Sequence, residues 1–266
     1  MSEEKWLVEG EKVIELGPVT NLKVSLVGGQ VDIIGHDEPT TRIEVHSVRG
    51  KGLKVVRDGG SLVVDHPQLN WDNFIEVFTS FRGTASADVS IMVPRAVALK
   101  LGVVSANALV SGLTEDASLS TVSGELSVDS LRGGVKLNSV SGEIAVSRHT
   151  GDVSLNTVSG EVTASGEISR FVADTVNGNV FLDLTGHADE VRVNTVSGSV
   201  TTRLVPDAAA QYKINTVGGR IHLDDSDISG TRGTFTGRYG SLDKTWTDIR
   251  VNTVGGDISV LHSVSA

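Results

Sequence analysis

Aliphatic residues alternate with small or polar residues in short runs along most of the chain. In residues 142–160, Ile144 and Val146 flank Ala145, and Val153 and Leu155 flank Ser154 after a turn. Alternation with a period of two is typical of β-strands. Each unit of this kind therefore predicts two short strands, each followed by a turn.

The same unit recurs along the chain, marked by the tetrapeptide Thr-Val-Ser-Gly and its variants. Its last position recurs first every 18 residues and then after 20, 21 and 37 residues, at Ala106, Gly124, Gly142, Gly160, Gly178, Gly198, Gly219 and Gly256. A fixed period indicates stacked copies of one supersecondary unit. Equivalent strands of stacked coils lie parallel, about 4.8 Å apart. The pattern predicts an all-β, single-domain parallel β-solenoid with two-strand coils, and right-handed crossovers are the default for such connections.

Stacking places equivalent residues of successive coils above one another. One predicted inward column contains Leu126, Ile144, Val162, Val180, Val200, Ile221 and Ile258. A second predicted inward column contains the valines of the tetrapeptide, Val122, Val140, Val158, Val176, Val196, Val217 and Val254. Leu155 and Val158 are three residues apart, so both can face inward only if the strand bends near Asn156.

Amides recur at the predicted bend. Asn tolerates the left-handed backbone conformation and can hydrogen bond its own main chain, so it suits a turn. We expect these side chains to bond one another from coil to coil as an internal turn ladder. Its members are Asn138, Asn156, Asn194, Asn215 and Asn252.

The strict period holds in only part of the chain. Residues 1–100 keep strand alternation without it and are predicted to form irregular coils that cap the stack, because terminal repeats must cover an exposed edge. Residues 101–223 are predicted to form regular coils of 18 to 21 residues. Residues 224–247 form an irregular insertion in this prediction, and residues 248–266 form the final coil of one continuous domain.

Two groups of residues outside the predicted core are candidates for interactions. Trp71, Phe74, Phe78 and Phe81 lie close together, with the spacing of an amphipathic turn or a folded loop. They form either a cap on the core or a contact surface for a partner. Glu125, Glu143 and Glu161 hold the same outward position in three successive coils, and their repulsion could be relieved by a cation or by basic side chains of a partner. The alternative for these glutamates is a solvated surface column.

Composition limits the function further. The 266 residues include no cysteine, which excludes disulfides, thiolate metal sites and thiol catalysis. The formal net charge is −10 without a basic cluster, which argues against nucleic-acid binding. The sequence has no run of 18 apolar residues, so it predicts no transmembrane helix. Residues Met1–Lys5 lack the pattern that begins a signal peptide. We therefore expect a cytoplasmic protein without a membrane span, although peripheral contact with a membrane stays open.

No catalytic, cofactor-binding or metal-binding motif stands in the context that it requires. Asp224, Asp225 and Asp227 lack the spacing of a calcium loop, and the seven histidines show no paired spacing on one strand. A residue repeated in every coil is a poor candidate for a nucleophile that is needed once. We expect no enzyme activity and no cofactor.

Units such as Thr-Val-Ser-Gly-Glu-Val and Thr-Val-Gly-Gly-Asp-Ile, with Gly-Gly-Gln-Val-Asp-Ile at 28–33 and Ser-Ala-Asp-Val-Ser-Ile-Met-Val-Pro at 86–94, resemble a known family. It is the bacterial β-strand-repeat family of unknown function called the putative adhesin or toastrack family, and the likeness is to its actinobacterial members without a membrane anchor. The resemblance implies a β-solenoid and a role in envelope stress or surface interaction. It supplies no catalytic residues.

These observations favour a non-enzymatic scaffold or protein-interaction module, with a protein partner or self-association. One alternative is a carbohydrate-binding or carbohydrate-active β-helix, which needs a groove with carboxylates and an aromatic platform. The outward positions of the regular coils, read as mostly Ser, Thr and Ala, speak against it. Further alternatives are an end-to-end filament and an ice-binding surface. The latter would use the repeated hydroxyls at Thr121, Ser139, Thr157, Thr175, Thr195, Thr216 and Thr253.

Overall fold

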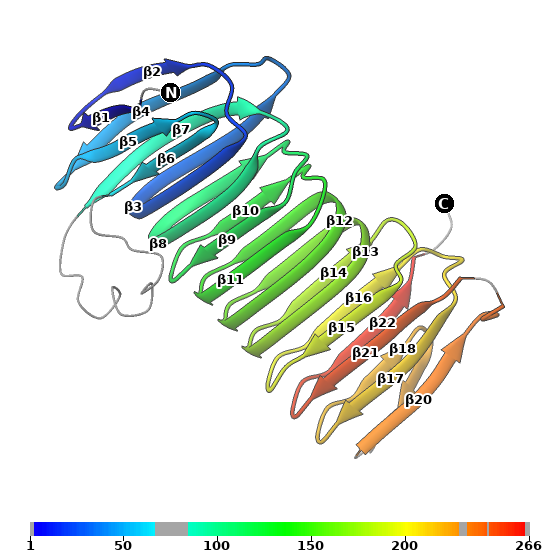
Figure 1. Cartoon of the computed structure of the whole chain (residues 1–266). Coiled ribbons are helices and arrows are strands. Elements are labelled where there is room, and N and C mark those ends of the chain that lie inside the picture. The colour runs from blue at the N-terminus through cyan, green and yellow to red at the C-terminus, as the bar shows by residue number, and fades with distance from the viewer. Residues whose placement is uncertain (1–2, 67–84, 229–232, 244, 264–266) are drawn as a thin grey trace. The chain divides into compact units, whose positions relative to one another are not determined.

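The computed structural model describes residues 3–66, 85–228, 233–243 and 245–263. All regular structure in these ranges is β-strand, as the sequence predicts. The chain divides into two compact units, Met1–Gly133 and Gly134–Ala266. Each unit is a stack of β-solenoid coils, and the predicted parallel pairing is confirmed in both (Figure 1). The predicted aromatic segment with Trp71, Phe74, Phe78 and Phe81 lies outside the described residues.

The described residues of the first unit form ten strands. They are β1 (Glu4–Val8), β2 (Lys12–Leu16), β3 (Asn21–His36), β4 (Thr41–Arg49), β5 (Leu53–Asp58), β6 (Ser61–Asp65), β7 (Ser86–Pro94), β8 (Ala98–Ser111), β9 (Ala117–Thr121) and β10 (Leu126–Asp129). The long strand β3 pairs in parallel with β6 and β7 along one edge and with β8 along the other. The chain thus builds an outer coil before it returns to continue the stack. Antiparallel strands β5 and β4 pair with that outer coil, and β1 and β2 pair with them in turn, which forms the irregular N-terminal cap.

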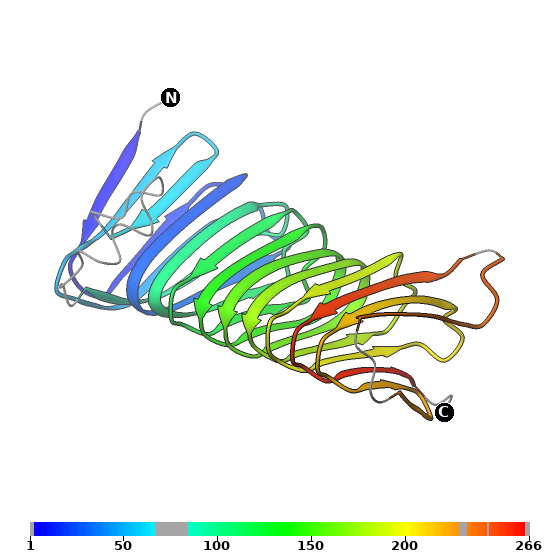
Figure 2. The same ribbon diagram turned by 90° about the horizontal axis from the view of Figure 1, so that it is seen from below.

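In the second unit, twelve strands lie within the part of the chain that the structure describes. They are β11 (Val135–Ser141), β12 (Ile144–Ser159), β13 (Val162–Asn177), β14 (Val180–Leu184), β15 (Glu190–Asn194), β16 (Val200–Leu204), β17 (Ala210–Thr216), β18 (Ile221–Leu223), β19 (Ser226–Ile228), β20 (Gly233–Tyr239), β21 (Thr247–Thr253) and β22 (Ile258–His262). A second view shows the coils of this unit stacked side by side, with the red last coil among the yellow and orange ones (Figure 2).

The coils of the second unit do not follow chain order. Strand β21 pairs in parallel with β15 on one side and with β17 on the other, and β22 lies in the same way between β16 and β18. The last coil of the chain therefore fills a gap between the two coils that precede it (Figure 1). Antiparallel strands β20 and β19 pair with β17 and β18 as the final layer of this unit.

The predicted aliphatic column that includes Ile144 and Val162 is confirmed. Its seven members, Leu126, Ile144, Val162, Val180, Val200, Ile221 and Ile258, are all buried. The register pairs Val200 with Ile258 and Ile258 with Ile221, so the column continues through the inserted coil.

The second predicted column is wrong at six of its seven positions, and only Val122 is buried as predicted. Val140, Val158, Val176, Val196, Val217 and Val254 are exposed, at 42 to 59% of their surface, and the preceding threonines or serine are buried instead. Strand β12 does not bend at Asn156 but continues to Ser159, so Leu155 and Thr157 face inward and Val158 faces out. One of these buried hydroxyls forms a hydrogen bond at the turn. Oγ1 of Thr216 accepts the N–H of Gly219 at 3.0 Å, which satisfies a buried donor.

The glycines of the tetrapeptide stack closely. A methyl group added to Gly256 would overlap the carbonyl oxygen of Gly198, and one added to Gly219 would overlap that of Gly256. Only glycine allows the backbones to approach this closely. The contacts follow the order Gly198, Gly256, Gly219, which is the spatial order of the coils.

Candidate ligand-binding groove on the last coils

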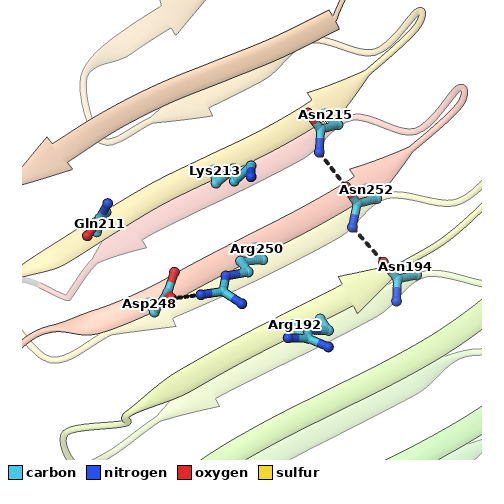
Figure 3. Close-up of a pocket in the computed structure, with 8 residues that line it drawn as sticks. All are labelled: Arg192, Asn194, Gln211, Lys213, Asn215, Asp248, Arg250 and Asn252. Atoms are coloured by element: carbon cyan, nitrogen blue, oxygen red, sulfur yellow. Dashed lines mark hydrogen bonds and ion pairs between the residues drawn. The ribbon is translucent and has the colours of Figure 1, made fainter.

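A groove of about 480 Å³ lies on the outward face of β15, β21 and β17 (Figure 3). Side chains at alternate positions of a strand share a face, and these three strands lie side by side in the second unit. We call this site the basic groove. It is lined by Arg192, Asn194, Gln211, Lys213, Asn215, Asp248, Arg250 and Asn252.

Three cations form the middle of the basic groove. Arg192 lies opposite Arg250, and Arg250 lies opposite Lys213, in the register of the parallel strands. Neighbouring strands are about 4.8 Å apart, so the charged side chains start from a row of closely spaced positions. The row exists only because the last coil is inserted between two earlier ones.

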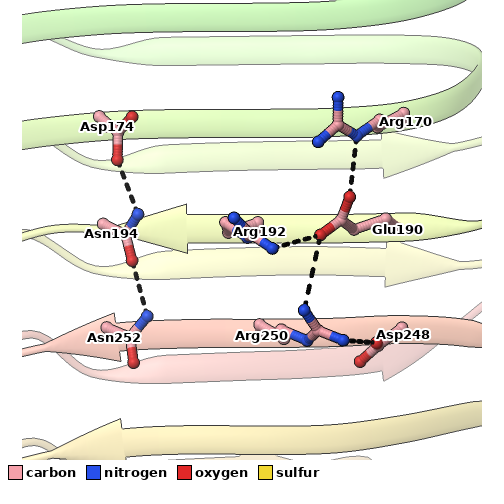
Figure 4. A network of polar contacts seen from close by, with 8 residues as sticks. All are labelled: Arg170, Asp174, Glu190, Arg192, Asn194, Asp248, Arg250 and Asn252. Carbon is pink, nitrogen blue, oxygen red and sulfur yellow. Dashed lines mark hydrogen bonds and ion pairs between the residues drawn. The ribbon is translucent and has the colours of Figure 1, made fainter.

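Carboxylates on one side of the row hold the two arginines (Figure 4). Glu190 accepts a hydrogen bond from Nε of Arg170 at 2.8 Å and one from Arg192 at 2.9 Å. Arg250 donates to Asp248 and lies 4.0 Å from Glu190. The hydrogen bond from Arg170, aided by the charges of Arg192 and Arg250, lowers the pKa of Glu190. Glu190 is therefore a fixed negative charge at neutral pH.

Lys213, unlike these arginines, is not held by a carboxylate in the described part of the chain. It forms no ion pair or side-chain hydrogen bond within the described part of the chain, and it is exposed. The groove lining contains three cations and one carboxylate, a formal charge of +2, whereas the whole chain has a formal charge of −10. The basic groove is thus a local positive site that lies open to an anion.

Amides line the other side of the row as a hydrogen-bonded ladder. Nδ2 of Asn252 donates to Oδ1 of Asn194 at 2.6 Å, and Nδ2 of Asn215 donates to Oδ1 of Asn252 at 2.5 Å. Asn194 donates in turn to Asp174 at 2.7 Å. Each amide has two N–H groups, and the ladder uses one of them. The second N–H remains to meet an acceptor on a ligand.

The sequence anticipated bonding between these amides but placed them wrongly. They lie on the outward face of continuing strands and not inside the solenoid, and none has a positive φ. The farther pair, Asn138 and Asn156, is also bonded on the outer surface, at 3.1 Å. The ladder is therefore part of a ligand-accessible face.

An exposed tryptophan adjoins the basic groove. Trp246 is 43% exposed and lines a hollow of about 440 Å³ with His187, Ala188, Asp189, Thr245, Thr247 and Asp248. Asp248 lines both the hollow and the groove, so the two adjoin at the start of β21. An aromatic face, carboxylates and basic side chains thus occur together on one surface.

The predicted glutamate column is not part of this surface. Glu125 belongs to the first unit, where Ser127 donates to it at 3.2 Å. Glu143 and Glu161 directly precede paired residues of β12 and β13 and are exposed on neighbouring coils.

The acidic turn after β18 is occupied by internal contacts: Asp224 binds His262 at 2.9 Å and Asp227 binds His222 at 2.6 Å. Within the described residues, no group of three or more His, Asp or Glu could hold a metal ion. In the same part of the chain, no helix has the length and apolar character needed to cross a membrane.

Comparison with known proteins places the fold in a family. The family model described as Toastrack DUF4097 matches residues 19–261. The chain belongs to this Toastrack family. No curated protein matches it.

Solved structures of bacterial proteins resemble this Toastrack chain at low sequence identity. A putative adhesin from Bacteroides fragilis is 13% identical, with 95% of this chain and 99% of that chain covered and a TM-score of 0.46. A putative lipid binding protein from Parabacteroides distasonis is 12% identical, with 96% and 95% covered and the same TM-score of 0.46.

The basic groove of this Toastrack chain was missed from the sequence, although a signal is present. In the last three repeats a basic residue precedes the Asn-Thr pair by two positions, as Arg192, Lys213 and Arg250. The earlier repeats have Lys136, Ser154 and Val172 at this place. The view that outward positions are mostly Ser, Thr and Ala is therefore wrong for the last coils.

Proposed function

We propose that this Toastrack chain is a non-enzymatic binding module, with the basic groove as its ligand site. The observation that carries the proposal is the row of Arg192, Arg250 and Lys213 beside an amide ladder. Hydrogen-bond donors dominate this surface, so its natural partner is an anion rich in hydrogen-bond acceptors. The groove lies on regular strands, which hold the donors in place before the ligand arrives.

The carboxylates of the groove are poor candidates for acid–base catalysis. A general acid needs a pKa near the working pH. The arginines around Glu190 lower its pKa, and Asp248 is held by Arg250. These contacts favour a binding role over hydrolysis of a bound ligand.

The structure gives less support to the other two candidate functions. An ice-binding face would need the repeated threonines to be exposed, and Thr157, Thr175, Thr195 and Thr216 are buried. Growth of a filament from an open solenoid end is opposed by antiparallel strands such as β20, which cover the outermost coil of their unit.

Charge reversal in the groove tests the proposal. We expect the protein to bind an immobilised polyanion such as dextran sulfate at low salt, and Lys213→Glu to weaken this binding by about tenfold or more, on the order of 1.4 kcal/mol. Lys136→Glu is the matched control, because Lys136 has the same place in its repeat but lies outside the groove. Equal effects of the two substitutions, or no binding by the parent protein, would contradict the proposal.

A further inference from the structure

We infer that the basic groove and the hollow of Trp246 together bind an acidic oligosaccharide. The inference rests on the proposed binding function and adds the class of ligand. It joins two surfaces, one that supplies cations and amides and one that supplies an aromatic ring. Asp248 lies at their junction.

The chemistry of the lining favours a glycan over a protein partner. All eight side chains of the basic groove are polar or charged. Protein interfaces instead have an apolar or aromatic centre surrounded by a polar rim. Here the aromatic residue stands at one end and the centre is polar, which suits a ligand that carries hydroxyl and acid groups along its length.

Trp246 supplies the complement to the polar groove. The C–H face of a pyranose ring is apolar while its rim is hydroxylated, so a sugar can stack on an indole and still bond polar groups at its edge. Trp246 has an exposed ring, and Asp189 and Asp248 line the same hollow as acceptors for hydroxyl groups. One sugar unit fits this chemistry at the hollow.

The cations specify an acidic sugar at the neighbouring position. Lys213 has no carboxylate partner in the described structure, and Arg238 of β20 lies on the strand next to it, opposite Gln211. An ammonium beside Arg250 is repelled by it, and an incoming carboxylate or sulfate would relieve that repulsion. A neutral sugar would leave the repulsion in place.

The dimensions require more than one sugar unit. The row from Arg192 to Lys213 spans two strand spacings, on the order of 10 Å. The hollow of Trp246 adjoins this row at Asp248, near the start of β21. A chain of sugars that carries its acid groups over the row and an uncharged ring face over the indole would occupy both parts.

Four probes of similar length distinguish the sources of negative charge. They are tetragalacturonate (carboxylates), a heparin-derived tetrasaccharide (sulfates), maltotetraose (no charge) and tetraglutamate (a peptide). Titration calorimetry at low salt should show binding of one or both acidic sugars. Maltotetraose and tetraglutamate should each bind at least about tenfold more weakly than the better acidic sugar. The carboxylate and sulfate arms then identify which acid group the row prefers.

Two substitutions test the two parts of the site. We expect Trp246→Ala and Lys213→Gln each to weaken binding of the acidic sugar by about tenfold, while Lys136→Gln and Trp6→Ala leave it unchanged. Thermal unfolding of each variant establishes that it is folded. The indole emission of Trp246, followed in a Trp6→Phe, Trp71→Phe background, should shift on titration with the same sugar and reports ring contact without removal of the side chain.

The outcomes separate this inference from the broader function. If tetraglutamate binds as tightly as the sugars and Trp246→Ala has no effect, the site is an anion site for protein and the glycan inference fails, while the proposed binding function stands. If maltotetraose binds as tightly as the acidic sugars, the role of Lys213 fails. If the protein binds none of the four probes and does not bind dextran sulfate, both proposals fail.

Discussion

Asn252 donates its Nδ2–H to Oδ1 of Asn194 at 2.6 Å, although 58 residues separate them in the sequence. Asn215, which is nearer to Asn194 in the chain, lies one strand farther away and bonds Asn252 instead. The last coil is therefore inserted between two coils that precede it. This order brings Arg250 between Arg192 and Lys213, and so it assembles the basic groove.

We expect Asn252→Ala to destabilise the second unit by about 1 to 2 kcal/mol. The substitution removes one ladder bond as donor and another as acceptor, and both partners stand on half-buried surfaces. The free energy of unfolding by denaturant is the measurement. Lys136→Ala, which removes an outward side chain without a ladder bond, should change it by less than about 0.5 kcal/mol. A loss no larger than this control would mean that the ladder adds nothing to stability.

Two adjacent glycines should respond very differently to alanine. A methyl group at Gly256 would overlap the carbonyl oxygen of Gly198, whereas at Gly255 no atom lies within 4 Å. Gly256→Ala must therefore push the last coil away from its neighbour, and we expect a loss of about 3 kcal/mol or more, against less than about 0.5 kcal/mol for Gly255→Ala. Thermal unfolding of both variants checks this. Similar melting temperatures would contradict the close stacking of these coils.

Stability should fall as the pH is lowered from about 7 to about 5. His66 is 1% exposed, and burial lowers its pKa from 6.5 to about 4. At pH values between these two, the unfolded chain binds a proton at this histidine and the folded chain does not, so protonation favours unfolding. Between about pH 7 and about pH 5, we expect protonation at His66 to lower the free energy of unfolding by about 2 kcal/mol.

Replacement of His66 isolates its share of the pH dependence. Its Nδ1 accepts the N–H of Val27 at 3.3 Å, and His66→Asn keeps an acceptor without a titratable ring. In this variant the free energy of unfolding should fall much less between about pH 7 and about pH 5. Substitution of the exposed His46 by Gln should leave that fall unchanged. The neighbouring Asp65 acts in the opposite direction, because burial raises its pKa, and it is unchanged in both variants. An undiminished pH dependence in His66→Asn would refute the assignment.

Much of the fold was predictable because it depends on periodicity. The column through Ile144 and Val162 follows from alternation and a constant interval alone. The choice between Thr157 and Val158 as the inward residue does not, because hydrophobicity favours valine. Strand β12 continues through this position, which places Thr157 inside and Val158 outside. The buried hydroxyl can accept a turn N–H, as Thr216 does from Gly219, or donate to a carbonyl, as Thr157 does to Ser159.

The order of the coils was not predictable from the repeats themselves. The strands around Val193, Ile214 and Val251 carry almost the same sequence, Val-Arg-Val-Asn-Thr, Tyr-Lys-Ile-Asn-Thr and Ile-Arg-Val-Asn-Thr. Each would fit beside either of the others with the same side chains inside. Only the long link between the second and third of these repeats hints that the chain leaves the stack and returns. The groove depends on this order, so neighbouring charges could not be assigned from the sequence.

Engineered disulfides test the order of the coils most directly, because the chain contains no cysteine. A disulfide needs Cα atoms about 4.4 to 6.8 Å apart, which adjacent strands satisfy and strands about 10 Å apart do not. The insertion predicts that the cysteine pairs Asn194→Cys with Asn252→Cys, and Asn252→Cys with Asn215→Cys, oxidise readily in the folded protein. The pair Asn194→Cys with Asn215→Cys should stay reduced. Rapid oxidation of that third pair, with no bond from position 252 to position 194, would show coils stacked in chain order and would leave the basic groove without its central arginine.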